Sequence, residues 1–555
     1  MKKKIICLIA DETNLSEQEV ENLLEVPPSI ELGDYSFPCF SLARIKKKSP
    51  VKISEEIVKK LKNSLVNEIS KIESKGPYVN IFIDKSFLAK EILLKDILNF
   101  KLDNKRIGIE YPSPNTNKPL HVGHLRNMAI GDSISRICSF VGNKVFHLNL
   151  FNDRGILISK SIVGYELYSK GKTPSDVRKE GDVFVGDLYV QFSKASKEDE
   201  SLEELAKDKL RKWEAGDKKV LELWSKMNAW TYEGMNKTFK KFGLLNVDKN
   251  YYESELYLKG KKIIEQGIKN GLFSKKKDGA VFINLEKDKL GEKILIRKDG
   301  TSVYMTTDLY LAKLKIEDFD LDSSYYVVGN DQEYHFKVLF NILNKLGFKK
   351  DWRHLSYGMV TLPEGKMKSR EGTAVSAEDL IEDTKKLALE GLKQRDASGD
   401  DLKERALKIS LAAIKYHLLK VDYRKKIVFN PKEALAFEGD TGPYLLYSYA
   451  RASSIIRKVK QNKEVTYSTF QPIEILLLKK IGNFEEVVKK AYLNSAPNLI
   501  ANYSYSLAKL FNEFYHSCPV VSSDNEGFRL KLVDKFRDTL KVSLNLLGIE
   551  VLEEM

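Results

Sequence analysis

The sequence predicts an α/β protein with a parallel sheet in a large central domain, a small α/β domain before it and an all-helical domain after it. Strand patterns alternate with helix patterns between residues 104 and 429, which is the order that βαβ units produce. Short helix and strand patterns also mix in the first hundred residues, whereas only helical apolar stripes remain near the C-terminus. We therefore expect three domains, 1–103, 104–429 and 430–555. The irregular, highly charged pattern at about 165–290 indicates an insertion whose charge runs are solvated faces.

Length and composition describe a globular protein and favour a polyanionic partner. The chain has 555 residues, of which 42% are hydrophobic and 31% charged, enough for several buried cores. Its net charge of +14 favours nucleic acid as a partner, although a lysine-rich proteome would give the same excess.

Cysteine usage and hydropathy indicate where the protein works. The four cysteines are scattered without a C-x-x-C pair, which argues against a disulfide framework or a structural zinc site and for a reducing compartment. Met1–Ala10 resembles a signal peptide until Asp11 and Glu12 end the apolar run, and no apolar run approaches a membrane span. We expect a cytoplasmic protein without membrane contact.

The two flanking domains show structural patterns and no catalytic motif. In the first, apolar residues at helical spacing over 53–69 predict an amphipathic helix, and Tyr78–Ile83 alternates like a strand. In the last, apolar stripes over 477–492, 499–514 and 532–547 predict core-facing helices, with Gly548 as a helix stop.

One stretch near residue 120 joins a strand to a helix through a turn with two imidazoles. Residues 107–111 alternate like a strand before two prolines, and 125–137 show helical spacing. Between them, His121 and His124 stand at a helix N-terminus, whose unpaired N–H groups suit phosphate. Gly123 lets a flat base approach the backbone. Histidines that cap the helix or bind a metal would produce the same short motif.

Further strands place polar residues where ligands bind to parallel sheets, at the carboxyl ends. The patterns predict strands over 145–151, 301–305, 325–329 and 355–362 and a helix over 338–346. Tyr304 and Asp308 lie at one predicted strand-to-helix junction, and Gln332 and His335 lie at another. Asp308 alone would more simply be a helix N-cap.

A basic loop follows the last of these strands. Its sequence is P-E-G-K-M-K-S-R-E-G-T, from Pro363 to Thr373. Cationic and hydroxyl groups concentrated between glycines suit a transferring triphosphate. An exposed basic turn would have the same composition.

The segment S-P-N-x-x-K-P-x-H-V-G-H-L-R resembles the adenylate-forming signature of class I aminoacyl-tRNA synthetases, and specifically of the arginyl-tRNA synthetases. Lys366 and Met367 match the K-M-S-K-S loop of that class, but the fourth position, normally the catalytic lysine, is Ser369. Arginyl enzymes often depart here and carry a lysine three residues before the first motif histidine. Lys118 occupies that position.

The resemblance extends to both flanking domains. G-D-Y-S-F-P and G-P-Y-V-N-I-F-I are similar to the N-terminal domain that touches the tRNA body, and D-T-G-P-Y-L-L-Y-S-Y-A-R-A is similar to the anticodon-binding domain. It implies a Rossmann-like class I catalytic core. It also implies that Tyr447 and Arg451 bind tRNA, with Tyr449 as a further candidate. More conservatively, at least one of these tyrosines packs inside.

The resemblance assigns roles to individual residues. The implied catalytic residues are Lys118, His121, His124, Lys366 and Lys368. The implied ATP-binding residues are His121, Gly123, His124, Lys366, Met367, Ser369 and Arg370. The implied arginine-binding residues are Ser113, Asn115, His124 and Gln332 for the main-chain groups, and Glu253, Tyr304 and Asp308 for the guanidinium. Paired carboxylates suit a planar fork of donors.

The implied function is ATP-dependent activation of L-arginine and its transfer to the 2′-OH of the terminal adenosine of tRNA(Arg), by a cytoplasmic monomer. ATP and its Mg²⁺ are the expected cofactors, with no protein-bound zinc or other metal. Two alternatives stay open: a class I synthetase for another amino acid, and a catalytically silent RNA-binding paralogue.

Overall fold

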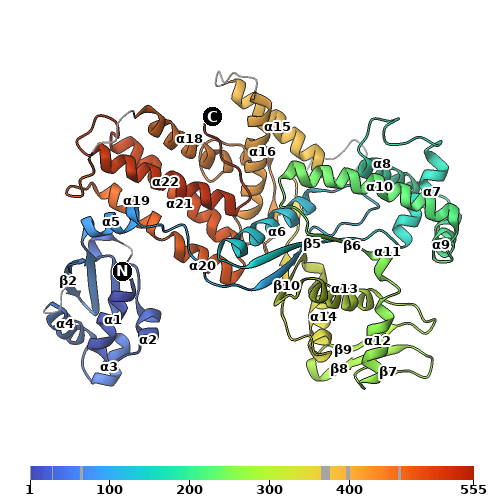
Figure 1. Cartoon of the computed structure of the whole chain (residues 1–555), viewed down its shortest axis with the longest axis horizontal. Coiled ribbons are helices and arrows are strands. Elements are labelled where there is room, and N and C mark those ends of the chain that lie inside the picture. Colours follow the sequence, from blue (N-terminus) through green and yellow to red (C-terminus); the bar gives the residue numbers. More distant parts are fainter. Residues whose placement is uncertain (1, 28, 63–66, 364–374, 395–400, 460–463) are drawn as a thin grey trace. The chain divides into compact units, whose positions relative to one another are not determined.

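The core of the central region is a five-stranded sheet with the order β11-β10-β4-β5-β6, and every neighbouring pair is parallel (Figure 1). The strands are β4 (Arg106–Glu110), β5 (Lys144–Phe151), β6 (Lys249–Tyr252), β10 (Ser323–Gly329) and β11 (Asp351–Tyr357). This confirms the parallel sheet expected from βαβ alternation. The carboxyl ends of its strands therefore share one edge.

The computed structural model describes residues 2–27, 29–62, 67–363, 375–394, 401–459 and 464–555. These residues form two units by their internal contacts. The first comprises 1–97, 455–483 and 510–536, and the second comprises 98–454, 484–509 and 537–555. The expected domain boundaries remain predictions, and each unit is described by itself below.

Two predicted strands differ from the structure. Residues 301–305 form only one bridge, from Ser302 to Ile296, before α13 (Tyr304–Phe319) begins. Val303 and Tyr304 favour a strand locally, but the helix buries Met305, Leu309 and Ala312 on one face, and this packing decides the outcome. The predicted strand over 355–362 divides into β11 and β12 (Val360–Thr361), and β12 pairs with β13 (Ile427–Val428).

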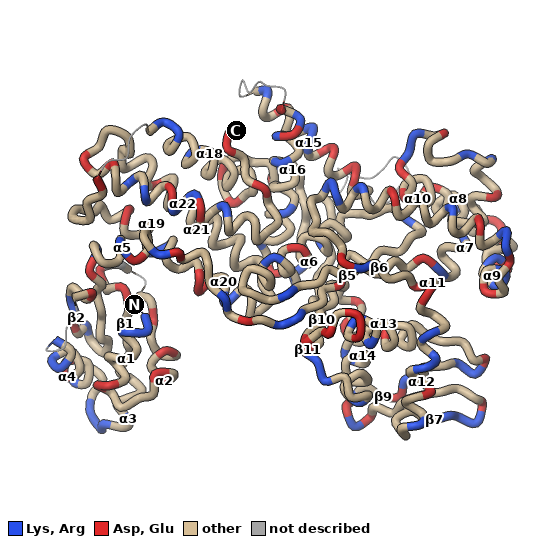
Figure 2. The backbone as a smooth tube through the Cα atoms, in the orientation of Figure 1, with Lys and Arg blue, Asp and Glu red and all other residues tan. Residues whose placement is uncertain are grey.

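Helices cover the parallel sheet and form the insertion. α6 (Val122–Phe140) and α7 (Ile156–Tyr168) follow β4 and β5, and the insertion then contributes α8 (Gly181–Ala195), α9 (Ser201–Glu214) and α10 (Lys218–Phe242). The segment forms regular amphipathic helices although its sequence pattern is irregular: α10 buries Met227, Met235 and Phe239, and its charged residues are mostly exposed, as expected of solvated faces. Both basic and acidic residues lie along α9 and α10 in Figure 2.

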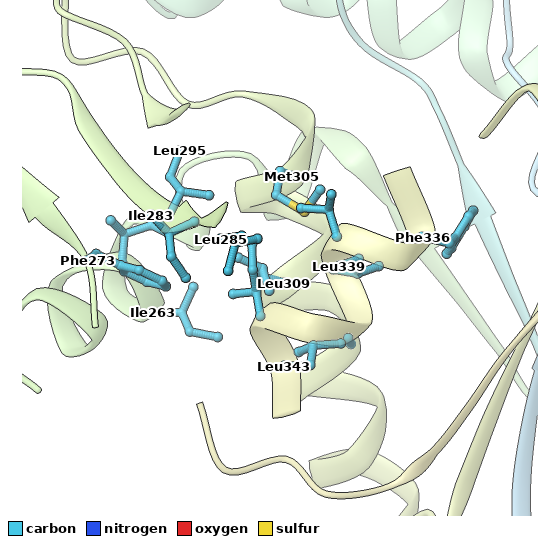
Figure 3. Close-up of a cluster of buried hydrophobic side chains, with 14 of the residues drawn as sticks. Ile263, Phe273, Ile283, Leu285, Leu295, Met305, Leu309, Phe336, Leu339 and Leu343 are labelled. Carbon is cyan, nitrogen blue, oxygen red and sulfur yellow. The ribbon is translucent and has the colours of Figure 1, made fainter. Parts of the chain in front are cut away.

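A second, antiparallel sheet supports the helices beside the site. β7 (Ser274–Lys275), β8 (Val281–Leu285) and β9 (Gly291–Ile296) pack with α12 (Gly260–Lys269), α13 and α14 (Glu333–Lys345) around one apolar cluster. Figure 3 shows Ile283 and Leu285 of this sheet facing Leu309 and Leu339 of the helices. This cluster fixes the starts of α13 and α14.

The C-terminal region is helical, as expected. It contains α15 (Ala377–Lys393), α16 (Leu402–Leu419), α17 (Pro431–Ala434), α18 (Gly442–Lys458), α19 (Pro472–Gly482), α20 (Phe484–Asn494), α21 (Pro497–Ser517) and α22 (Glu526–Leu546). The predicted single stripe over 477–492 is divided by Asn483 between α19 and α20. Gly548 has φ +67° and stands just after α22, as predicted for a helix stop.

The N-terminal residues fold around a three-stranded antiparallel sheet with the order β1-β3-β2. Its elements are α1 (Lys2–Thr13), α2 (Glu17–Leu23), β1 (Tyr35–Pro38), α3 (Phe40–Lys46), α4 (Pro50–Leu61), β2 (Ile69–Lys75), β3 (Tyr78–Ile83) and α5 (Lys85–Leu94). The predicted helix over 53–69 stops at Leu61, because Ile69 pairs with Ile83 in the sheet. The signal-like start is α1, which buries Ile5, Ile6 and Ile9.

Candidate active site

Two histidines form the turn that starts α6. The N–H of Gly123 donates to Nδ1 of His121 at 3.1 Å, and the N–H of His121 donates to Nδ1 of His124 at 3.0 Å. Because both Nδ1 atoms accept, the proton of each neutral ring lies on Nε2, which can donate to a ligand. Helix capping and ligand binding are therefore compatible here.

Burial keeps these imidazoles neutral. It lowers the pKa of His121 to about 4, and the nearby charge of Lys118 acts in the same direction. Burial, then His121 and Lys118, hold the pKa of His124 well below its usual range. The structure thus places Lys118, a predicted catalytic residue, near His121 and His124, which are predicted at the ATP site.

The insertion fixes the turn that carries Lys118. A Cβ added to Gly186 of α8 would lie 2.3 Å from Cδ of Pro119, so the helix approaches this turn as closely as glycine allows. Sequence patterns gave no role to Gly186, because its partner lies in a different part of the chain.

Residues 366–370 of the basic loop, which include Lys366, Met367, Lys368, Ser369 and Arg370, lie outside the described residues. The chain on either side of the loop is anchored to the histidine turn and its helix. The N–H of Ala377 donates to the carbonyl of Leu120 at 2.7 Å, and Ser376 bridges to His121. On the other side, the buried guanidinium of Arg126 donates to the carbonyl of Gly358 at 2.7 Å.

Ser113 and Asn115 lie on the turn that follows β4. Ser113 has φ +50°, and its N–H donates to Oδ1 of Asn149 at 3.1 Å. Asn115 bridges to Asn152, at the end of β5, and is exposed. Both predicted residues therefore lie at the carboxyl edge of the parallel sheet.

Carboxylates from three elements lie near one another at this edge. Burial raises the pKa of Glu253, at the end of β6, to about 7; Arg154 opposes this rise, whereas Asp153 and Asp308 reinforce it. Asp153 is itself buried and accepts from the hydroxyl groups of Tyr232 at 2.9 Å and Ser254 at 2.7 Å. Such a group of acidic side chains suits a cation.

Asp308 contacts His335 across two helices. Its Oδ2 lies 2.6 Å from Nε2 of His335 on α14. The N-cap of α13 is Val303, so the simpler interpretation of Asp308 as a cap is wrong. Tyr304, one turn earlier, is 76% exposed, and Gln332, at the N-cap of α14, is also exposed. The structure thus pairs Asp308 with His335, places Glu253 close enough for the charge of Asp308 to raise its pKa, and leaves Tyr304 and Gln332 open to solvent.

Comparison with known proteins identifies the family. The catalytic domain of "tRNA synthetases class I (R)" matches residues 88–430, the "Arginyl tRNA synthetase N terminal domain" matches 1–83, and the "DALR anticodon binding domain" matches 445–555. The chain belongs to the arginyl-tRNA synthetases of class I. An arginine–tRNA ligase of Treponema denticola is 44% identical over 96% of this chain and 94% of its own length. One of Borrelia hermsii is 39% identical over 100% of this chain and 98% of its own length.

Solved structures agree with this family assignment. The arginyl-tRNA synthetase of Thermus thermophilus superimposes with a TM-score of 0.84 and 26% identity, over 100% of both chains. That of Plasmodium falciparum, at 22% identity, has the same fold with a TM-score of 0.80 over 100% of this chain and 99% of its own. The expected class I core with an α/β N-terminal domain and a helical C-terminal domain is confirmed.

On α18 of this synthetase, Tyr447 and Arg451 contact each other. The guanidinium carbon of Arg451 lies 4.7 Å from the centre of the Tyr447 ring, and a guanidinium nitrogen lies 3.1 Å from its hydroxyl oxygen. Tyr449 is buried and donates to Glu553 at 2.8 Å. The expectation that at least one of the tyrosines packs inside is therefore confirmed.

The described part of the synthetase offers no cluster of three or more His, Cys, Asp or Glu residues suited to a metal ion. Its four cysteines are free thiols. No helix among the described residues is long and apolar enough to cross a membrane. A Mg²⁺ that arrives with ATP keeps several waters and needs few protein ligands, so it does not require such a cluster.

Proposed function

We propose that this chain is an arginine–tRNA ligase that activates L-arginine with ATP and transfers it to tRNA(Arg). The observation that carries the proposal is the position of two carboxylates beside a class I catalytic sheet: Asp308, 2.6 Å from His335, and Glu253, which directly follows β6. The carboxylate of arginine attacks the α-phosphate of ATP and pyrophosphate leaves. The 2′-OH of the terminal adenosine then attacks the arginyl carbonyl, and AMP leaves.

The histidine turn is the proposed ATP site. The Nε2–H groups of His121 and His124 donate to phosphate oxygens, and the positive end of α6 favours the same charge. A Cβ on Gly123 would lie 2.9 Å from the His121 ring, so glycine keeps the imidazole in place. From the resemblance alone, Lys366, Met367, Ser369 and Arg370 complete the ATP site and Lys368 assists catalysis.

The carboxylate group is the proposed guanidinium site. Asp308 and Glu253 offer paired acceptors to the planar fork of arginine, and His335 fixes the orientation of the Asp308 carboxylate. Tyr304 and Gln332 join the ligand from exposed positions at the starts of α13 and α14. Ser113 and Asn115, with His124, hold the α-amino and α-carboxylate groups.

Lys118 is the proposed catalytic cation for adenylate formation. Its charge is close enough to His121 and His124 to lower the pKa of both rings. A cation held there can stabilise the negative charge that develops on the α-phosphate in the transition state. Ser369 cannot supply that charge.

The remaining assignments concern partners. We propose that residues 1–103 contact the tRNA body, that 430–555 read the anticodon with Tyr447 and Arg451, and that the enzyme acts as a cytoplasmic monomer. The net charge of +14 supports a polyanionic partner.

An aminoacylation assay with total tRNA and each of the twenty amino acids tests the proposal. We expect esterification of arginine only, and none by the His121→Ala/His124→Ala variant, which serves as the control for contaminating synthetase. Charging with another amino acid would establish the rival synthetase. No charging at all, together with retained tRNA binding, would establish the silent RNA-binding paralogue.

A further inference from the structure

A buried ion pair lies next to the turn that carries Ser113. Lys315, on α13, is 0% exposed, and its ammonium contacts the carboxylate of Glu110, the last residue of β4, which is 6% exposed. The ammonium also lies 4.3 Å from the centre of the Tyr326 ring on β10. An apolar pair of similar volume would often stabilise a fold as well as a buried ion pair does. Stability alone therefore does not account for this pair.

The second carboxylate oxygen of Glu110 leads to Ser113. Oγ of Ser113 donates to Oε1 of Glu110 at 3.2 Å, and the same Oγ accepts from the N–H of Leu150 at 3.2 Å. Ser113 needs such contacts because its φ of +50° is uncommon for a residue other than glycine. Glu110 is thus part of the network that holds this turn in one conformation.

The ion pair also borders the guanidinium site. Lys315 follows Asp308 by seven residues, two turns along α13, so the two side chains lie on the same side of the helix. The pKa of Lys315 is raised: burial lowers it, but Glu110, Tyr326 and Asp308 together outweigh that effect. Since Lys315 offsets the charge of Glu110, the remaining carboxylates of the site are Asp308, Glu253 and Asp153.

We propose that Glu110 and Lys315 are a positioning pair for the amino-acid site: Lys315 fixes the Glu110 carboxylate, and Glu110 fixes the Ser113 turn. This inference rests on the proposed function, which assigns Ser113 to the main-chain groups of arginine. It adds two residues that touch no substrate. The pair should therefore affect binding of the amino acid and leave binding of ATP unchanged.

Two double variants test the proposal. Glu110→Leu/Lys315→Met removes both charges and the acceptor for Ser113. Glu110→Gln/Lys315→Met removes both charges and keeps an amide oxygen for that hydroxyl. We expect the first to raise the arginine KM about fivefold to tenfold, the effect of one lost hydrogen bond, with the ATP KM changed by less than about twofold. The second should recover most of the arginine affinity.

Several results would overturn the proposal. Equal arginine KM values in the two double variants would show that the acceptor has no role, and a parallel rise of both KM values would indicate a general structural effect. If a double variant fails to fold, Ser113→Gly provides a further test. This variant leaves the ion pair intact and removes the hydroxyl group, and glycine tolerates the positive φ of this position. An unchanged arginine KM in Ser113→Gly would contradict the proposal.

The control is a surface pair on the same helix. Lys313 contacts Glu317 at 2.8 Å, and Lys313→Gln should change neither KM. If the wild type charged a different amino acid, the proposed function would fail. The positioning role would then be judged separately, from the KM of that amino acid in the same variants.

Discussion

At the residue scale, the site uses burial in two opposite ways. Burial holds His121 and His124 neutral, which makes them donors that are ready at every pH near neutrality. Burial also raises the pKa of Glu253 to about 7, so the free enzyme carries this carboxyl partly protonated at neutral pH. The neutral imidazoles can donate hydrogen bonds to a nucleotide. The raised pKa of Glu253 makes the binding of a cation depend on pH.

Glu253 should therefore impose a pH dependence on arginine use. Its carboxyl is neutral below a pKa of about 7 and ionised above it, and only the ionised form attracts the guanidinium. Between pH 6 and pH 8 the ionised fraction rises about tenfold, so kcat/KM for arginine should rise by roughly that factor. In Glu253→Gln this rise should disappear. A rise that persists in the variant would assign the titration to another group.

Asp308→Asn should damage arginine use far more than ATP use. The variant loses one charge-assisted contact in a partly desolvated site, worth roughly 2–5 kcal/mol, so kcat/KM for arginine should fall by more than about tenfold. Asp331→Asn, which changes an exposed carboxylate just after β10, is the matched control and should have little effect. A change of less than about tenfold in Asp308→Asn would remove Asp308 from the guanidinium site.

Lys118→Ala should slow adenylate formation by roughly 10²–10³, the usual loss for one transition-state donor. The ATP KM should change much less, because the contact strengthens in the transition state. Single-turnover adenylate formation measures this directly. Ser369→Ala should be mild, and Lys118→Ala/Ser369→Lys should recover part of the rate. A near-wild-type rate for Lys118→Ala would show that the loop lysines suffice.

Sequence reasoning located residues that are close in the chain. His121, His124 and Lys118 fall within seven positions, so a motif is enough to group them. Glu110 and Lys315 are 205 residues apart, and their contact requires β4 and α13 to pack. No local pattern contains that information, and the same holds for the contact between Asp308 and His335.

At the element scale, α6 packs on the sheet at a glycine. A Cβ on Gly131 would lie 2.3 Å from the ring of Tyr111, which is fully buried and stacked on His147. The helix that presents the histidines therefore sits as near to β4 as the backbone permits. The position of the ATP site relative to the sheet depends on this contact.

Gly131→Ala should lower the apparent melting temperature, because overpacking a filled core costs about 1–3 kcal/mol. Gly391→Ala, in α15, is the control, because it makes the same substitution at a helix position with free space. There the added Cβ meets only Phe437, at 3.8 Å, and alanine in a helix is favoured by roughly 0.5–1 kcal/mol, so the melting temperature should rise slightly. Thermal unfolding of both variants checks this. Equal shifts would mean that the close approach to Tyr111 is easily relieved.

The elements themselves were predictable where pattern and packing agree. Residues 145–151 and 325–329 are predicted as strands and are strands, since both segments are short and rich in aromatic or β-branched residues. Residues 301–305 are predicted as a strand, but α13 begins at Tyr304. The buried face of this helix includes Leu309 and Ala312, which lie beyond the segment from which the strand is predicted. The sequence pattern of 165–290 is irregular because the charged residues obscure the apolar face of α10.

At the scale of the whole molecule, the residues expected as one C-terminal domain belong to two units. Residues 455–483 and 510–536 associate with the N-terminal residues: Ser86 donates to the carbonyl of Tyr467 at 2.5 Å, and Lys479 contacts Asp34 at 2.6 Å. Residues 484–509 and 537–555 belong with the catalytic region, where Ser133 of α6 donates to the carbonyl of Leu546 at 2.7 Å. Deleting residues 430–555 would therefore cut into both units, so point substitutions are the better probe of tRNA binding.

Arg451→Gln should weaken tRNA binding and its dependence on salt. If Arg451 contacts one phosphate, its loss should lower the slope of log K against log salt by about one, for every tRNA that binds the same way. Tyr447→Phe keeps the ring on which Arg451 lies and removes only the hydroxyl that it contacts at 3.1 Å, so it should leave the slope unchanged. Filter binding of total tRNA between low and physiological salt measures both. An Arg451→Gln enzyme with the wild-type slope and affinity would show that the Tyr447–Arg451 pair packs within the protein and does not contact RNA.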